Sequence, residues 1–359
     1  MRARALVLLL ATACGNSGPL VDWEPTDSAA WRGSAATELV AVRAALEGGD
    51  LDGARTRLAI VLLAEPNLLT GRFLLQELDL AAPGADQAAF AAAARARAAV
   101  PGAAPIEFLL AARLEPDPAA ARLLLQGAMA TAVSPDFEAA CRYALAYLAF
   151  QDGDAKAARN ALAASLALDP GAFRARRLEA RLEAKLGDTA RAEILLAHWL
   201  DLSESAPEVG SEVWYAALVE LAALRVALDD RGGAQDALER LALPRFLGAY
   251  PAAQDGARAD GLFVAAALDA EAGEPEAALQ KVRAARELVS AKSRGGRLAM
   301  VDEALLDELF LDRELDASAA WRAVLERFEG AGAAVDLDEL MRALEARVRL
   351  ARLEAKRPK

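Results

Sequence analysis

A motif that occurs twice at an interval of 34 residues limits this chain to few architectures. The first copy contains Gly153, Asp154, Ala158, Leu162 and Pro170, and the second contains Gly187, Asp188, Ala192 and Leu196 at matching offsets. This period in Ala- and Leu-rich sequence predicts a helix–turn–helix unit stacked on a copy of itself. In each unit the Gly takes the tight turn between two helices and the small Ala lets the helices approach closely, and in the first copy Pro170 ends the second helix.

Further copies of the pattern extend along the chain, with less regular spacing toward the C-terminus. We expect copies at Gly49 (with Ala54, Leu58 and Pro66), Gly84 (Ala89, Ala93, Pro101), Gly232 (Ala237, Leu241) and Gly273 (Ala278, Val282, Ala285), and a degenerate copy at Pro116 (Ala121, Leu125, Ala128). The longer intervals in the second half predict lengthened helices or loops rather than a second fold.

The residues of these copies resemble the tetratricopeptide (TPR) repeat. The resemblance implies an all-α fold, an α-solenoid of stacked antiparallel helix pairs that wind into a TPR-like superhelix. It also implies that the protein binds other proteins in an inner groove lined by the first helix of each pair. We therefore expect TPR-like repeats over residues 34–204, degenerate repeats over 205–297 and closing helices over 298–359.

Composition supports this architecture and argues against nucleic-acid binding. Hydrophobic residues make up 55% of the chain and aromatic residues only 5%, which suits close-packed helices better than a β-rich core. The formal charge is −12 and the isoelectric point is near 4.9. An acidic body repels the phosphate backbone, so we expect no nucleic-acid partner.

The sequence predicts neither an enzyme nor a cofactor or metal site. Motifs for phosphate loops, dinucleotide binding, zinc proteases, redox cysteine pairs and serine hydrolases are absent. We interpret His198, the single histidine, as a packing or surface residue. Cys141 is expected to be a buried free thiol. The acidic residues between 302 and 314 lack the spacing of a calcium-binding EF-hand loop, so we interpret them as a solvated helix face.

The first residues resemble the signal peptide of a bacterial lipoprotein. Arg2 and Arg4 precede a short apolar run, and residues 11–14, Ala-Thr-Ala-Cys, resemble the lipobox in which small residues precede a lipidated cysteine. The resemblance implies a signal peptide over residues 1–13, lipidation of Cys14 and attachment to the membrane through that lipid. Gly15 follows the cysteine where an inner-membrane signal would have Asp, which implies an outer-membrane protein that faces the periplasm.

Residues 14–33 are expected to form the lipidated cysteine and a flexible tether, because Gly, Pro, Ser and Asp occur there without helical periodicity. Trp23 and Trp31 lie in this stretch. We expect them to dock on the first helices; the alternative is contact with the membrane interface.

Two neighbouring repeats contain the candidate peptide-binding residues. With each turn Gly counted as position fifteen, the groove-facing positions in the TPR family are, in this sequence, Tyr143, Tyr147, Phe150, Arg174, Arg177, Arg181 and Lys185. Basic and aromatic side chains together suit an extended peptide with an acidic residue or a C-terminal carboxylate. The alternative is that the basic row is a solvated face and the tyrosines belong to the core. Leu74, Leu78 and Phe263 fall at groove positions of other repeats, or in the core.

These features predict a lipid-anchored, non-catalytic scaffold of the bacterial cell envelope that binds proteins or extended peptides in its concave groove. The alternative is a structural spacer that tethers an envelope complex through its convex or C-terminal surface. The partner and the oligomeric state do not follow from the sequence.

Overall fold

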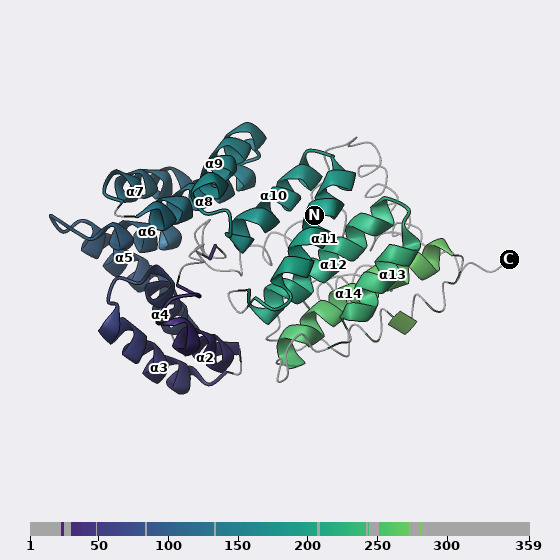
Figure 1. The fold of residues 1–359 in the computed structure, drawn as a ribbon, viewed down its shortest axis with the longest axis horizontal. Helices are drawn as coiled ribbons and strands as arrows, with labels where there is room; N and C mark the ends of the chain where they lie inside the picture. The colour runs from purple at the N-terminus through teal and green to yellow at the C-terminus, as the bar shows by residue number, and fades with distance from the viewer. Residues whose placement is uncertain are drawn as a thin grey trace, which may run out of the picture. The chain divides into compact units, whose positions relative to one another are not determined.

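The computed structural model describes residues 23–24, 30–47, 49–82, 85–132, 134–206, 209–241, 243, 251–272, 274, 277, 280–281 and 284. All regular secondary structure in these residues is α-helical (Figure 1). The helices are α2 Ala36–Glu47, α3 Leu51–Ala64, α4 Leu69–Ala81, α5 Gln87–Ala98, α6 Pro105–Leu114, α7 Pro118–Ala130, α8 Pro135–Gln151, α9 Ala155–Leu168, α10 Phe173–Lys185, α11 Thr189–Ser203, α12 Ser211–Ala227, α13 Arg231–Arg240 and α14 Pro251–Glu271. The predicted all-α fold is confirmed. None of these helices is long and apolar enough to cross a lipid bilayer.

Several predicted features lie outside the described residues. These are the signal peptide, Cys14 and the closing helices beyond residue 297, together with the turn residues Gly84 and Gly273 and the side chain of Phe263. The predictions made for them stay predictions.

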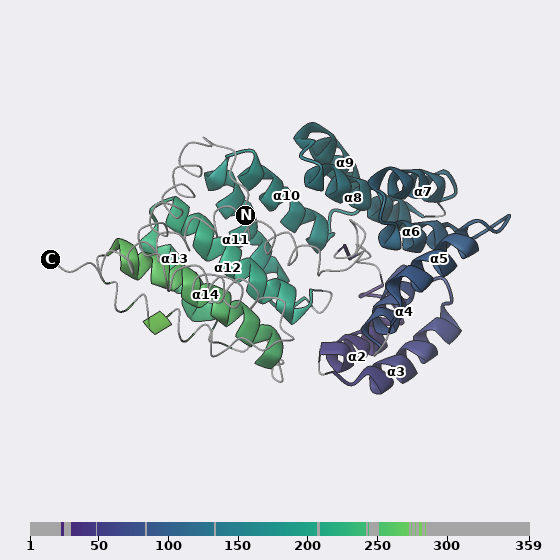
Figure 2. The same ribbon diagram turned by 180° about the vertical axis from the view of Figure 1, so that it is seen from behind.

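Consecutive helices pack against each other as in an α-solenoid. The chain divides into two compact units within α10, after Glu179. In unit 1, contacts join α2 to α3 and α3 to α4, and they join α5, α6, α7, α8 and α9 in turn. In unit 2 they join α11, α12 and α13 in turn. Figures 1 and 2 show this succession of helices from opposite sides. The short turns make the pairs α2–α3, α6–α7, α8–α9 and α12–α13 antiparallel helical hairpins.

First helices also contact the first helices of neighbouring pairs. In unit 1, α4 contacts α6, and Gln76 Nε2 of α4 donates a hydrogen bond to the carbonyl oxygen of Leu110 in α6 at 3.1 Å. In unit 2, α12 contacts α14. Because the first helices stack on each other in this way, their side chains can line a common face, as the resemblance to the TPR repeat implies.

The expected turns have the conformation that requires glycine. Gly49, Gly153 and Gly187 have φ angles of +76°, +78° and +87°, which residues with a Cβ rarely adopt. After Gly153, the side chain of Asp154 accepts a hydrogen bond from the backbone N–H of Ala157 at 3.0 Å and so caps α9. The repeated Gly-Asp pair therefore ends one helix and begins the next.

The expected small-residue contacts are also present in five copies of the repeat. At five and nine residues after the predicted turn position, the buried residues are Ala54, Leu58, Ala121, Leu125, Ala158, Leu162, Ala192, Leu196, Ala237 and Leu241. The degenerate copy at Pro116 keeps the pattern because Asp117 caps α7 through the N–H groups of Ala119 and Ala120. A turn residue other than Gly thus leaves the packing of the hairpin intact.

One copy buries different residues from those predicted. In the copy assigned to Gly84, Ala89 and Ala93 are exposed, and α5 instead buries Ala91, Ala94 and Ala98. The shift has a local cause, because α5 begins after Asp86, whose side chain accepts a hydrogen bond from the N–H of Ala89.

The predicted turn at Gly232 is wrong by three residues. Asp229 takes the left-handed conformation with φ of +59°, and Asp230 caps α13. Gly232 and Gly233 lie in the first turn of this helix. Asp tolerates the left-handed region better than most residues, so it can replace the expected glycine.

The apolar core at the start of unit 1 contains Leu74 and Leu78, for which the sequence allowed either a groove position or a core position. Leu74 and Leu78 are buried with Leu39, Leu58 and Trp31 in a cluster formed by α2, α3, α4 and the segment before α2. Both leucines are core residues and do not line a groove.

Candidate peptide-binding site

The predicted aromatic residues lie on α8, which begins at Pro135 after the capping residue Ser134. Tyr143 and Phe150 are buried, and Tyr147 is partly buried. The rings of Tyr143 and Tyr147 contact each other edge to face, with centroids 6.5 Å apart and an interplanar angle of 66°.

The predicted basic residues lie on α10. Arg174, Arg177, Arg181 and Lys185 are all partly buried. Arg174 and Arg177 belong to unit 1, whereas Arg181 and Lys185 follow the division of the chain at Glu179. Of these four, Arg174 forms an ion pair with a residue that the sequence did not predict to be part of the site, Glu24.

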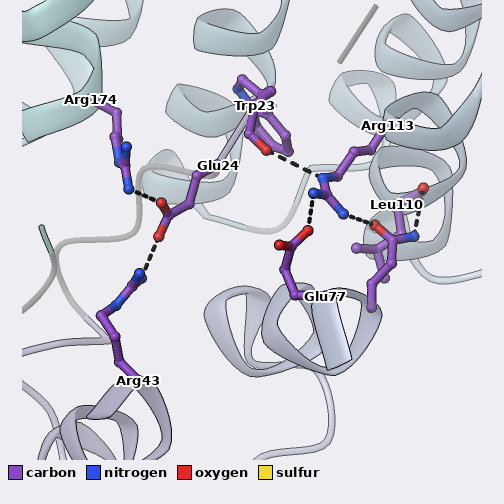
Figure 3. A network of polar contacts seen from close by, with 8 residues as sticks. Trp23, Glu24, Arg43, Glu77, Leu110, Arg113 and Arg174 are labelled. Carbon is purple, nitrogen blue, oxygen red and sulfur yellow. Dashed lines mark hydrogen bonds and ion pairs between the residues drawn. The ribbon is translucent and has the colours of Figure 1, made fainter. Parts of the chain in front are cut away.

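Trp23 and Glu24 come from the stretch that was expected to be a tether, yet they are seated on unit 1. The ring of Trp23 packs on Tyr143 with centroids 6.1 Å apart and an interplanar angle of 33°, and the residue is only 1% exposed. The carboxylate of Glu24 lies between the guanidinium groups of Arg43 and Arg174 and forms ion pairs with both (Figure 3).

The two ion pairs of Glu24 are largely shielded from water. The side chains of Glu24, Arg43 and Arg174 are 17%, 15% and 14% exposed. Shielding strengthens the attraction between opposite charges but makes removal of one partner costly. Arg43 is also held from its other side, because its guanidinium lies 5.1 Å from the ring centroid of Trp31.

Arg113 of α6 binds the main chain of the same segment. Its Nε donates a hydrogen bond to the carbonyl oxygen of Trp23 at 3.3 Å, and its Nη1 donates to Oε1 of Gln76 at 2.8 Å. Arg113 also forms an ion pair with Glu77 (Figure 3). Its guanidinium lies 4.5 Å from the ring centroid of Phe73. Arg113 is only 2% exposed, and such burial of a guanidinium is tolerated when its donors and charge are matched in this way.

The side chains that contact residues 23–24 come from different first helices. We call these side chains the first-helix face; they are Arg43 of α2, Arg113 of α6, Tyr143 of α8 and Arg174 of α10. The structure therefore brings together two of the predicted site residues, Tyr143 and Arg174, with two that were not predicted.

The repeat pattern itself contains the signal for the two missed residues. Counting with the turn position as fifteen places Arg43 at the ninth position of the Gly49 repeat and Arg113 at the twelfth position of the Pro116 repeat. These are the same positions that were used for Tyr147 and Phe150. In contrast, no local pattern identifies Glu24, because it is 150 residues away from Arg174 in the sequence.

The tryptophans of the expected tether have different positions. Trp31 packs in the core of α2, α3 and α4, as expected for docking on the first helices. Trp23 lies farther along the repeats, on α6 and α8.

The remaining candidate residues, Cys141 and His198, lie outside the first-helix face. Cys141 is a buried free thiol whose pKa is raised to about 12, mainly by burial and also by the negative charge of Glu138. His198 is exposed on α11. The part of the chain that the structure describes contains no group of three or more His, Cys, Asp or Glu residues arranged to hold a metal ion.

Comparison with known proteins gives no family. No family model matches the chain, and no curated protein matches it. The chain is similar to a solved structure described as "Structure of Naa15/Naa10 bound to HypK-THB", with 16% identity over 88% of this chain and 39% of that chain, and a TM-score of 0.28. The chain thus spans about two fifths of the chain it matches. This likeness is too distant to carry an argument about function.

Proposed function

We propose that this chain is a non-catalytic scaffold that binds an extended segment of another protein through its first helices. One observation carries the proposal: a piece of chain without regular secondary structure, Trp23–Glu24, is already seated on the first-helix face. A surface that holds an aromatic ring, a main-chain carbonyl and a carboxylate at the same time has the contacts that peptide recognition requires.

The binding surface extends beyond residues 23–24 in this proposal. Within unit 1, the partly buried Tyr147 continues the aromatic side chains along α8, and Arg177 continues the basic row along α10. An acidic partner segment, or one that ends in a carboxylate, matches this combination of side chains.

We further propose that the scaffold is anchored in the bacterial cell envelope by a lipid on Cys14, at the outer membrane and facing the periplasm. The support is the resemblance of residues 1–14 to a lipoprotein signal peptide. Labelling cells with a clickable fatty acid tests the anchor, because Cys14→Ala should abolish the label. A labelled Cys14→Ala protein would contradict the proposal.

The alternative function, a spacer that binds through its convex surface, has one observation in its favour. Ile60 and Leu63 on α3 and Leu123 on α7 are 59%, 85% and 69% exposed, although they are apolar. They lie on second helices, which do not contribute to the first-helix face.

Photo-crosslinking from single positions distinguishes the two functions. A photoreactive amino acid at Tyr147 or Arg177 should capture the partner in intact cells, whereas the same amino acid at Ile60 or Leu123 should not. Mass spectrometry of the crosslinked product identifies the captured protein. Capture from Ile60 and Leu123 alone would contradict binding by the first helices and favour the spacer.

A further inference from the structure

The Trp23–Glu24 segment has the contacts of a bound ligand rather than those of a linker. Its two residues touch four helices that are far apart in sequence, with separations of 19 residues to Arg43, 90 to Arg113 and 150 to Arg174. Such separations are typical of a peptide that crosses the inner surface of a solenoid, where each repeat contributes one or two side chains.

The aromatic part of this recognition depends on the ring rather than on the indole N–H. Trp23 is buried against Tyr143, which in turn contacts Tyr147. The indole Nε1 of Trp23 is buried and has no hydrogen-bond acceptor among the described residues. Contact area therefore selects the side chain, and a phenylalanine or tyrosine can make the same kind of contact.

The polar contacts involve the main chain of Trp23 and the side chain of Glu24. Arg113 donates to the carbonyl oxygen of Trp23, a contact that any residue at that position offers. Arg43 and Arg174 then hold the carboxylate of the following residue, Glu24, between them. A guanidinium binds a carboxylate through directed hydrogen bonds as well as charge, so this position selects an acidic residue.

We propose that the first-helix face recognises an extended aromatic–acidic pair, that Trp23–Glu24 is its resident occupant, and that a protein partner with such a pair binds by displacing it. This inference rests on the proposed scaffold function and specifies the ligand of the same site. The partner and the resident segment compete because Arg43 and Arg174 are both already paired with the carboxylate of Glu24, so a partner's carboxylate must replace it.

The resident segment has an advantage over a partner because it is part of the same chain. Only residues 25–29 separate Glu24 from Ala30, which is packed in the core formed with α2, α3 and α4. A short connection of this kind gives an effective local concentration in the millimolar range. A separate ligand therefore binds with an apparent dissociation constant equal to its intrinsic constant divided by the fraction of molecules in which the face is free.

Binding of a peptide in trans tests this inference. The probe is a fluorescent peptide with the sequence of residues 18–29, and its binding to the full chain is measured by fluorescence anisotropy. We expect it to bind the double variant Trp23→Ala/Glu24→Gln at least about tenfold more tightly than the wild type, because the variant no longer occupies its own face. The single variant Glu24→Gln, which keeps the ring, should bind the probe with an intermediate affinity.

Two controls make the test specific. Trp214→Ala removes a buried tryptophan of unit 2 that packs on Tyr215 and Arg240, so it should leave the affinity for the probe at the wild-type value. A probe that carries Ala and Gln at the positions of Trp23 and Glu24 should not bind the double variant. The inference would be overturned if the wild type, Glu24→Gln and Trp23→Ala/Glu24→Gln bound the probe with equal affinity. It would also be overturned if neither variant bound the probe.

The peptide-binding test and the crosslinking test can fail independently, so failure of this inference is distinguishable from failure of the proposed function. Crosslinking of a partner from Tyr147 and Arg177 without any binding of the peptide would overturn the aromatic–acidic specificity and leave the scaffold standing. Binding of the peptide without a crosslinked partner would support the recognition and contradict the scaffold function.

Discussion

The ion pairs of Glu24 provide the most informative perturbation of the fold. At an effective dielectric constant of about 20, two opposite charges about 4 Å apart attract each other by about 4 kcal/mol. Desolvation of three largely shielded side chains opposes this gain, so we expect a net coupling between Glu24 and Arg174 of about 1–3 kcal/mol. Glu24→Ala alone should cost about 3–5 kcal/mol, because it leaves the positive charges of Arg43 and Arg174 facing each other.

A double-mutant cycle measures this coupling. The free energy of unfolding is determined by urea denaturation for the wild type, Glu24→Ala, Arg174→Ala and the double variant. We expect the double variant to be less destabilised than the sum of the two single variants.

The Glu38–Arg57 pair is a matched control. Its two side chains are 40% and 50% exposed and 3.3 Å apart, so the same cycle should give a coupling of no more than about 0.5 kcal/mol. A coupling for Glu24 and Arg174 as small as that of the control would refute the conclusion that residues 23–24 are an integral part of unit 1.

Three further predictions concern single residues. Gly153→Ala should destabilise unit 1 by about 1 kcal/mol because φ is +78°, and Gly153→Asn should cost less, as measured by urea denaturation. Cys141 should react with a thiol reagent only as fast as the protein unfolds, because the thiol is buried and its pKa is about 12; rapid reaction of the native protein, followed by absorbance, would contradict this. Burial raises the pKa of Asp260 from 3.8 to about 8, so the folded state retains a proton that the unfolded state loses, and stability should fall as pH rises between these values. The slope should approach about 1.4 kcal/mol per pH unit, and Asp260→Asn should remove it; equal slopes for the wild type and the variant would contradict the raised pKa.

The fold was predictable because it depends on local patterns. The Gly-Asp turns and the buried Ala–Leu contacts recur at fixed offsets, and three of the expected turns have the left-handed glycine that the pattern requires. The failures are equally local. At Asp86 and Asp229 a capping or turn residue outside the pattern moved the start of the helix by one to three residues.

The binding residues were predictable only in part, for a physical reason. Tyr143 and Arg174 follow from position within a repeat, and Arg43 and Arg113 follow from the same count. The contact between Glu24 and Arg174 depends on how several repeats stack, and no pattern within one repeat contains that information. A stretch rich in Gly and Pro predicts a tether, whereas one buried indole and one carboxylate hold part of it on the repeats.

Fluorine NMR of the full chain with 5-fluorotryptophan at its five tryptophans tests the seating of Trp23 most directly. The resonance of Trp23 is identified by its loss in Trp23→Phe. We expect it to be displaced from the position of the free amino acid and to show no shift when H₂O is replaced by D₂O, because the ring is buried against Tyr143. A Trp23 resonance at the free position with the full solvent isotope shift would contradict a segment bound on the first helices.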